Sequence, residues 1–273
     1  MADARSWSML ECVINISEGR RLPVVHAIAS RAGQELLDIH SDPDHNRSVI
    51  TVVGEDAARA ITSAAIASLR LDHHAGVHPR IGVVDVVPFV PLGSASLDDA
   101  LAARDRFARW AADEHGVPCF VYGPERTLPA IRKHAFIQLD PDTGPPNPHV
   151  TAGAIAVGAR PILVAYNLWL ADPDLALARA IATELRSDSV RTLGLAVGNH
   201  VQVSCNLIDP WQVGPAEVFQ QVADRATVAR AELVGLVPRS LVEAIDPNSW
   251  DRLNLSLDQT IEQRLEQQHL AVD

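Results

Sequence analysis

The sequence is poor in aromatic residues and has no excess of positive charge. Phe, Trp and Tyr make up only 4% of the 273 residues, and 34 Asp and Glu outnumber 23 Lys and Arg, which gives a formal net charge of −11. An acidic surface offers no counter-charge to phosphate groups. The composition therefore argues against a nucleic-acid partner and against binding to an anionic membrane surface.

Long hydrophobic runs are missing as well. The chain contains no apolar stretch of about 18 residues, the length that a transmembrane helix needs. Its first residues include Asp3 and Arg5 and lack the apolar segment of a secretory signal peptide. We therefore expect a cytoplasmic protein.

Cysteines and several standard motifs are scarce or absent. Cys12, Cys119 and Cys205 are odd in number, far apart and set among aliphatic residues, which favours buried thiols over disulfides or a zinc site. The glycine-rich signatures of dinucleotide-binding proteins, P-loop NTPases and α/β-hydrolases do not occur in the sequence. The usual sequence evidence for those three classes is therefore lacking.

The hydrophobic pattern that is present predicts an α/β fold. With 47% hydrophobic and 21% charged residues, the chain can form one large domain or two of roughly 130 residues each. Apolar periodicity predicts the order βαββαβ in the first half. The predicted strands are residues 10–15, 35–39, 48–53 and 81–89. One predicted helix begins at Pro23, and a second spans residues 55–70. A further helix at 96–115, opened by a Ser96–Asp99 capping box, and a strand at 119–122 follow.

The second half repeats this order. Its predicted strands are residues 162–169, 193–197, 201–207 and 233–237. Its predicted helices are residues 173–185, capped by Asp172, and residues 215–228. A polar helix at residues 257–268 is predicted for the tail. Between the halves, residues 140–153 contain four prolines and two glycines, which no regular element accommodates. We expect a linker or a binding loop there, and subdomains at 1–153 and 154–273.

The densest polar cluster lies at residues 72–80. It contains His73, His74 and His78, followed by Arg80. Because Pro79 biases the preceding residue to extended geometry, a loop is favoured over a helix that would place two histidines on one face. His78 could move a proton near neutral pH, and Arg80 could hold a carboxylate. Surface histidines, or a metal-dependent hydrolase built on the three histidines and Asp85, remain open alternatives.

Two other polar segments are weaker candidates. Residues 40–47, from His40 to Arg47, join two predicted strands and are equally consistent with a solvated Asx turn. Residues 15–20, beginning at Asn15, follow the first strand and could present backbone N–H groups to a ligand. On residues alone the chain is an α/β enzyme with a histidine-containing cleft.

A family resemblance makes these candidates more specific. The chain resembles the glutamate formiminotransferase domain in nearly its whole length, without the cyclodeaminase part. The matching segments are 11–19 (ECVINISEG), 36–38 with Asn46 and Arg47, 76–91 (GVHPRIGVVDVVPFVP), 127–132 (TLPAIR), 158–160 with Asn167, and 233–238 (LVGLVP).

The resemblance implies two α/β subdomains flanking a substrate groove and transfer of a formimino group from N-formimino-L-glutamate to N5 of tetrahydrofolate. It places the acid/base histidine on His78 and implies a homodimer, with tetrahydrofolate as co-substrate and no metal. The implied substrate- and folate-binding residues are Asn15, His40, Arg47, Arg80, Gly144, Pro145, Pro146, Asn147, Pro148, His149, Val150, Thr151, Ala152 and Gly153.

The chain departs from the animal members of the family at two positions near the site. His40 and Val77 stand where those sequences have acidic residues. Two alternatives therefore stay open: a folate-binding protein of the same fold without turnover, and a formimino or formyl transferase that uses a different donor amine.

Overall fold

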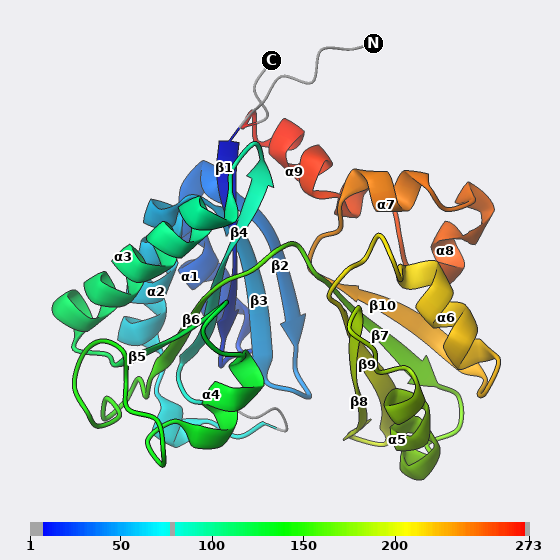
Figure 1. The fold of residues 1–273 in the computed structure, drawn as a ribbon, viewed down its shortest axis with the longest axis horizontal. Helices are drawn as coiled ribbons and strands as arrows, with labels where there is room; N and C mark the ends of the chain where they lie inside the picture. Colours follow the sequence, from blue (N-terminus) through cyan, green and yellow to red (C-terminus); the bar gives the residue numbers. More distant parts are fainter. Residues whose placement is uncertain (1–7, 77–79, 271–273) are drawn as a thin grey trace. The chain divides into compact units, whose positions relative to one another are not determined.

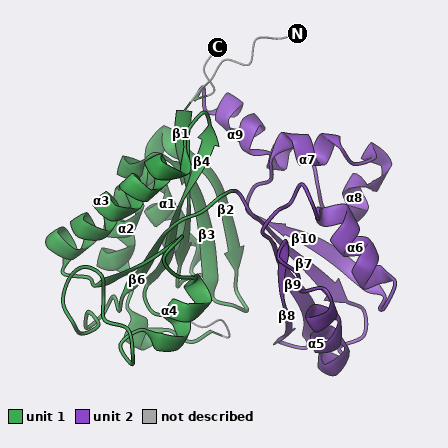
Figure 2. Ribbon diagram, viewed as in Figure 1, with its two compact units in different colours: residues 1–161, 270–273 green, residues 162–269 purple. Residues whose placement is uncertain are grey.

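The computed structural model describes residues 8–76 and 80–270, which form two compact units. The first unit runs through Pro161 and includes Leu270, and the second is Ile162–His269 (Figure 2). Within the described ranges, no helix has the length and apolar character needed to span a bilayer.

The first unit is built on a six-stranded sheet in the order β2-β3-β1-β4-β6-β5 (Figure 1). β1 pairs antiparallel with β3 and β4, whereas β6 pairs parallel with β4 and β5. Its strands are β1 (Ser8–Ile16), β2 (Leu36–Asp42), β3 (Arg47–Val53), β4 (Val84–Gly93), β5 (Cys119–Tyr122) and β6 (Ile155–Ala159). Its helices are α1 (Leu22–Ala29), α2 (Glu55–Ser68), α3 (Leu97–His115) and α4 (Leu128–His134), with 3₁₀ turns at Ser30–Glu35 and Leu71–His73.

Alternation along the strands divides the sheet into two faces. Cys12, Ile14 and Ile16 of β1 point into the main core with the apolar faces of α1, α2 and α3. On the other face, α4 packs Ile131 against strand residues such as Val86 and Phe120. The rest of that face, toward β2 and β3, carries polar strand residues.

The second unit has a four-stranded antiparallel sheet in the order β10-β7-β9-β8. Its strands are β7 (Val164–Leu170), β8 (Val190–Val197), β9 (His200–Leu207) and β10 (Val228–Val234). Its helices are α5 (Leu175–Glu184), α6 (Pro215–Ala223), α7 (Arg239–Glu243), α8 (Trp250–Leu253) and α9 (Ile261–Gln267), with 3₁₀ turns at Pro247–Ser249 and Leu257–Gln259. One sheet face buries Tyr166, Leu168 and Val203 with residues of α5 and α6.

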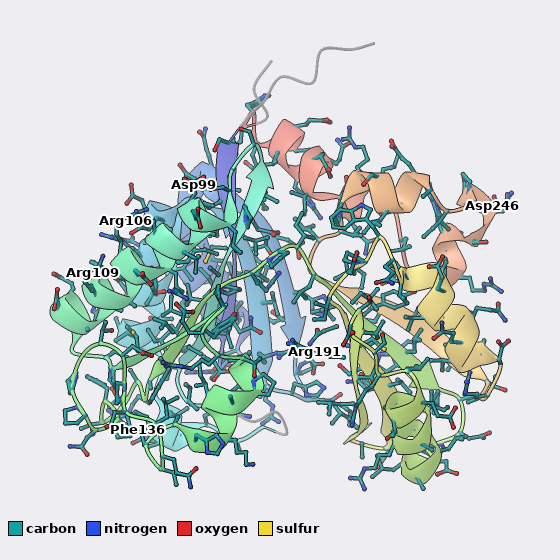
Figure 3. All side chains as sticks on the ribbon, viewed as in Figure 1. Asp99, Arg106, Arg109, Phe136, Arg191 and Asp246 are labelled. Atoms are coloured by element: carbon teal, nitrogen blue, oxygen red, sulfur yellow. The ribbon has the colours of Figure 1, made fainter. Side chains whose placement is uncertain are left out.

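The predicted fold class is confirmed. Each unit contains a βαββαβ sequence of elements whose four strands pair in the order 4-1-3-2. The Ser96–Asp99 capping box is present at the start of α3, where Figure 3 labels Asp99. All three cysteines are buried and free, as expected.

Several predicted boundaries were wrong. β6 and α4 were missed, and the helix predicted at 173–185 begins at Leu175 with Asp174 as its N-cap, not Asp172. The last strand is Val228–Val234, earlier than predicted. Leu236 and Val237 are buried, yet Val237 exchanges backbone hydrogen bonds with Gln259 and Ile261 in the tail. Leu236 and Val237 are apolar because they are buried, and they are not part of a strand of the sheet.

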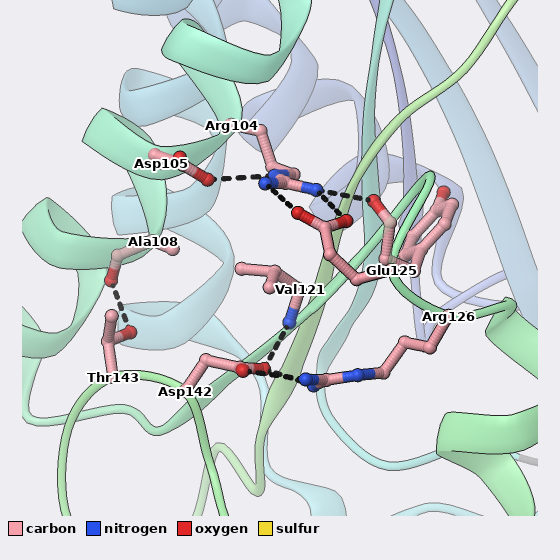
Figure 4. A network of polar contacts seen from close by, with 9 residues as sticks. Arg104, Asp105, Ala108, Val121, Glu125, Arg126, Asp142 and Thr143 are labelled. Carbon is pink, nitrogen blue, oxygen red and sulfur yellow. Dashed lines mark hydrogen bonds and ion pairs between the residues drawn. The ribbon is translucent and has the colours of Figure 1, made fainter.

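A buried arginine ties α3 to the end of β5 (Figure 4). The guanidinium of Arg104, 3% exposed, donates two 2.8 Å hydrogen bonds to the Glu125 carboxylate and others to Asp105 and the Tyr122 carbonyl. These bonds satisfy a cation that would otherwise be costly to bury. They lower the pKa of the Glu125 carboxyl to about 2, because Arg104 favours its charged form.

We predict that Glu125→Gln destabilises the protein at neutral pH and not in acid. The folded-state pKa lies below the ordinary 4.5, so this stabilisation is complete above 4.5 and is lost as pH falls toward about 2. Because the Glu125 side chain is 46% exposed, solvent screening limits the loss at pH 7 to about 1 kcal/mol. Urea unfolding of both proteins at pH 7, 4 and 3 measures the difference. Glu114→Gln on α3 is the control, and a pH-independent difference for Glu125→Gln would contradict the assignment.

A second prediction concerns the contact of β5 with β6. Gly158 lies beside Tyr122 in the sheet, and a Cβ on Gly158 would come within 2.0 Å of the Tyr122 ring. Gly158→Ala should therefore cost about 1–3 kcal/mol by overpacking and lower Tm by several degrees. Thermal unfolding of Gly158→Ala in the wild-type and Tyr122→Ala backgrounds tests the cause. An equal loss in both backgrounds would exclude the ring as the obstacle.

Candidate functional site

The loop after β1 and the β2–β3 hairpin are bound to each other at one end of the first sheet. The Gly19 N–H donates to Asn46 Oδ1 at 3.0 Å, and Ser48 Oγ donates to the Glu18 carbonyl at 2.6 Å. A Cβ on Gly19 would lie 2.3 Å from the Asp42 carbonyl oxygen and 2.6 Å from the Arg47 nitrogen, so the close approach requires glycine. Two of the three polar segments found in the sequence therefore form one structure.

The turn between β2 and β3 is an Asx turn, and its Asn46 also contacts the histidine-rich segment. Asp42 Oδ1 accepts hydrogen bonds from the N–H groups of Asp44 and His45, both at 2.8 Å. Asn46 has a left-handed backbone, with φ of 49°, and its Nδ2 donates to the Ala75 carbonyl at 3.0 Å. Asn46 thus links the loop after β1 to the histidine-rich segment.

A buried carboxylate organises the neighbouring arginines. Asp85, 2% exposed, accepts a hydrogen bond from the Ile81 N–H at 2.7 Å and a bidentate pair from Arg132 of α4. Burial lowers the pKa of Arg47 and of Arg80, while the charge of Asp85 opposes this lowering in both. Three guanidinium groups therefore lie near one carboxylate that is already bidentate with Arg132.

Arg47 differs from Arg132 because its own guanidinium is not paired. Within the part of the chain that the structure describes, Arg47 makes no side-chain hydrogen bond or ion pair. The charges of Asp85 and Asp42 act on Arg47, but neither carboxylate forms an ion pair with its guanidinium, which is therefore available to a substrate anion.

Asn15 and His40 lie on the same face of the sheet as Arg47. Both are direct neighbours of Val49 on β3, Asn15 from β1 and His40 from β2, and Arg47 precedes Val49 by two residues. Side chains two apart on a strand share a face. The structure thus brings together three residues that the sequence separates, and Asn15 Nδ2 donates to the Val13 carbonyl at 3.1 Å.

Residues 144–153 divide into two parts. Pro145, Pro146, Asn147 and Pro148 are exposed, and a Cβ on Gly144 would be 3.1 Å from Ala112 of α3. From His149 onward the segment turns inward: His149 and Gly153 exchange backbone hydrogen bonds, and His149 Nδ1 accepts from the Ala152 N–H at 3.0 Å.

The inner part of this segment contacts both flanks of the histidine-rich stretch. The Thr151 carbonyl accepts from the Leu71 N–H at 2.7 Å, and the Ala152 carbonyl accepts from the Val83 N–H at 2.9 Å. Val150 is 87% exposed, whereas Ala152 and Gly153 are buried. The predicted folate segment is therefore hydrogen bonded to Leu71 and Val83, the residues that precede and follow the histidine-rich stretch in the sequence.

His78 lies outside the described residues, as do Val77 and Pro79. Of its neighbours, His73 is on the surface with its side chain 74% exposed, and His74 Nε2 lies 2.8 Å from the Asn46 carbonyl oxygen and 3.1 Å from Arg80 Nη1. Across residues 8–76 and 80–270, no group of three His, Cys, Asp or Glu side chains could hold a metal ion.

The cysteines are poor candidates for nucleophilic chemistry. Burial raises the pKa of the Cys119 and Cys205 thiols to about 12 and raises that of Cys12 well above its ordinary value. At neutral pH these thiols are protonated, and the thiolate is the reactive form.

A cavity of about 370 Å³ lies beside the hairpin turn and the histidine-rich stretch. Its walls come from the loop after β1, the hairpin turn, the end of α2 and the Leu71–His73 turn. The lining residues are Ser17, Glu18, Arg20, Arg21, Asn46, Ser68, Leu69, Arg70, His73 and His74.

The sequence did not identify Arg132 or Arg70 as site residues, and it did not predict that several basic side chains would line this cavity. The available signal for Arg132 was Asp85 itself, since a carboxylate inside the apolar run 81–90 needs a buried cation partner. No sequence feature pointed to Arg70, because only the folded structure places it in the lining of the cavity.

Comparisons with known proteins identify the family of the chain. Residues 9–160 match the family model of the formiminotransferase domain, N-terminal subdomain. The chain is 33% identical to the glutamate formimidoyltransferase of Thermoplasma acidophilum, over 91% of this chain and 96% of that protein. It is 32% identical to the glutamate formimidoyltransferase of Streptococcus pyogenes, over 87% and 92% of the two chains.

A longer relative is similar over part of its length. The formimidoyltransferase-cyclodeaminase of Sus scrofa is 34% identical over 86% of this chain, which spans about half (51%) of that protein. With matches along most of this chain and nearly all of two stand-alone relatives, the chain belongs to the formiminotransferase family.

Proposed function

We propose that this protein transfers the formimino group of N-formimino-L-glutamate to N5 of tetrahydrofolate and releases glutamate. The observation that carries the proposal is the similarity to two glutamate formimidoyltransferases over nine-tenths of their length. The site in the first unit supplies cations for an anionic donor, which supports the same reaction.

The reaction requires proton transfer in both directions. N5 of the folate attacks the electrophilic amidine carbon, and the tetrahedral intermediate then expels the glutamate amine. N5 must lose a proton and the departing nitrogen must gain one. We assign both transfers to His78, because a histidine near its ordinary pKa can act as base and then as acid, which contributes roughly 10²–10⁴-fold.

Arg47 and Arg80 are proposed to bind a carboxylate of the donor. Asp85 is bidentate with Arg132, which leaves the charge of Arg47 without a paired anion among the described residues. Both arginines lie near a buried carboxylate, so a second anion placed between them would be partly desolvated and strongly attracted. Asn15 and His40, on the same sheet face as Arg47, would provide polar contacts to the bound donor.

Residues 144–153 are proposed to contact tetrahydrofolate. Three prolines restrict the exposed part of this segment, and its inner part is hydrogen bonded to Leu71 and Val83. A segment that is already restrained loses less conformational freedom when the folate binds. The proposal also includes a cytoplasmic homodimer, as the family resemblance implies, with these two small molecules as substrates and no bound metal.

The direct test is an assay of the purified chain with tetrahydrofolate and formiminoglutamate, with detection of 5-formiminotetrahydrofolate and glutamate. We expect turnover by the wild-type protein and a loss of about 10²–10⁴-fold in kcat for His78→Asn, because proton transfer is removed. The Tm of the variant should stay within a few degrees of the wild-type value. His26→Asn is the matched control, since His26 is exposed on α1 and lies outside the lining of the cavity.

Three results would contradict this proposal in different ways. Folate binding without turnover would favour a non-catalytic protein, and turnover with another formimino donor would change the substrate. Near wild-type kcat in His78→Asn would place the acid/base residue elsewhere.

A separate prediction addresses the folate segment. Replacing Pro145, Pro146 and Pro148 together by glycine should raise the Kd for folate several-fold, since each released residue adds a cost on the order of 1 kcal/mol or less to ordering the loop. Equilibrium binding and single-turnover kinetics distinguish affinity from chemistry, and the single-turnover rate at saturating folate should change little. The control is a second triple variant, in which Pro173, Pro210 and Pro247 of the second unit are replaced by glycine. Unchanged folate affinity in the first variant would make residues 144–153 a plain linker.

A further inference from the structure

The cavity of about 370 Å³ in the first unit is lined by several basic side chains. Three arginines and two histidines line it, against a single acidic residue, Glu18, although the chain as a whole has a net charge of −11. Its volume lies in the range typical of small-molecule sites. The concentration of positive charge is therefore a local property of this cavity.

The one acidic residue is already neutralised. Glu18 Oε1 accepts from the N–H groups of Arg20 and Arg21, both at 2.9 Å, and Glu18 Oε2 accepts from Arg21 Nε at 2.5 Å. Burial opposes its charged form, but these hydrogen bonds outweigh burial and lower the pKa of the Glu18 carboxyl. Glu18 is thus anionic at neutral pH and is paired with Arg21.

Arg20 remains as a cation that faces the cavity without a carboxylate partner. Its Nε donates to the Pro43 carbonyl at 2.8 Å, and no carboxylate in residues 8–76 or 80–270 forms an ion pair with it. The Pro43 contact holds the guanidinium group in place and leaves its two terminal nitrogens for other acceptors.

Arg70 and His74 add further polar groups to the lining of this cavity. Arg70 is bidentate with Asp72 through Nε and Nη2, so its Nη1 is not used in that pair. His74 Nδ1 is buried and has no hydrogen-bond partner among the described residues. A buried polar atom of this kind gains from a ligand that can hydrogen bond to it.

We infer that this cavity binds one end of the glutamate part of the formimino donor, with Arg20 and Arg70 as the residues that recognise the carboxylate that Arg47 and Arg80 do not bind. The inference rests on the proposed function and extends it, because no role has been assigned to these two arginines. Guanidinium groups suit carboxylates, whereas the cavity has no Phe, Tyr or Trp wall for the aromatic rings of folate. The tail glutamate of tetrahydrofolate carries the same chemistry, so the experiment distinguishes the two sources.

The test measures KM for each substrate and direct binding of L-glutamate in Arg20→Met. We expect KM for formiminoglutamate to rise about tenfold or more, and KM for tetrahydrofolate and kcat to stay within about twofold. Calorimetric titration with L-glutamate, without folate, should show binding to the wild type and its loss in Arg20→Met. Arg20→Lys, which keeps the charge, should recover part of the affinity.

Arg109→Met is the matched control, because Arg109 is exposed on α3 (Figure 3) and outside the cavity. An unchanged KM for formiminoglutamate in an active Arg20→Met would overturn the inference and leave the proposed function intact. A rise in KM for tetrahydrofolate alone would overturn it in favour of the folate tail. If the wild type fails to turn over formiminoglutamate, glutamate binding that requires Arg20 would still support a dicarboxylate site while the proposed reaction fails.

Discussion

The site depends on the burial of one carboxylate, that of Asp85, at the beginning of β4. A charged group that is 2% exposed must be paired and hydrogen bonded, and here Arg132 and the Ile81 N–H meet that requirement. This single constraint holds α4 against the open face of the sheet and fixes the chain just after residue 80. The charge of Asp85 also opposes the burial that lowers the pKa of Arg47 and Arg80. Loss of Asp85 would leave several half-buried cations without compensation.

The proposed binding of an anionic substrate rests on the cations that gather in this part of the first unit. In a chain with a net charge of −11, arginines gather where the loop after β1, the hairpin turn and the histidine-rich stretch meet. Mutual repulsion among them is a cost in the free protein, and a dicarboxylate ligand would remove it. Hydrogen bonds between the side chains of Asn46 and Ser48 and the backbone of neighbouring segments hold these loops in place. Binding of the proposed ligand would therefore require little rearrangement of the loops.

Local pattern explains which elements could be predicted. Both βαββαβ orders follow from apolar periodicity and capping residues, which act over a few residues. β6, with Gly158 and small alanines, has weak strand propensity and is a strand because β4 and β5 pair with it on either side. α4 spans only seven residues and is stabilised by Ile131 packing on the sheet. The end of the last strand was misplaced because Leu236 and Val237 are buried by the tail, which periodicity cannot distinguish from sheet burial.

By itself the sequence determined the fold class, the buried thiols and the family, because each follows from neighbouring residues or from ordered motifs. Tertiary structure alone decided which charges meet: Asp85 and Arg132 are 47 residues apart, and the cavity combines three separate segments. It also decided that Arg132, and not Arg47, forms the ion pair with Asp85. Desolvation and charge interaction depend on distance in space and not on position in the chain, so side chains far apart in sequence acquire their role only when the sheet brings them together.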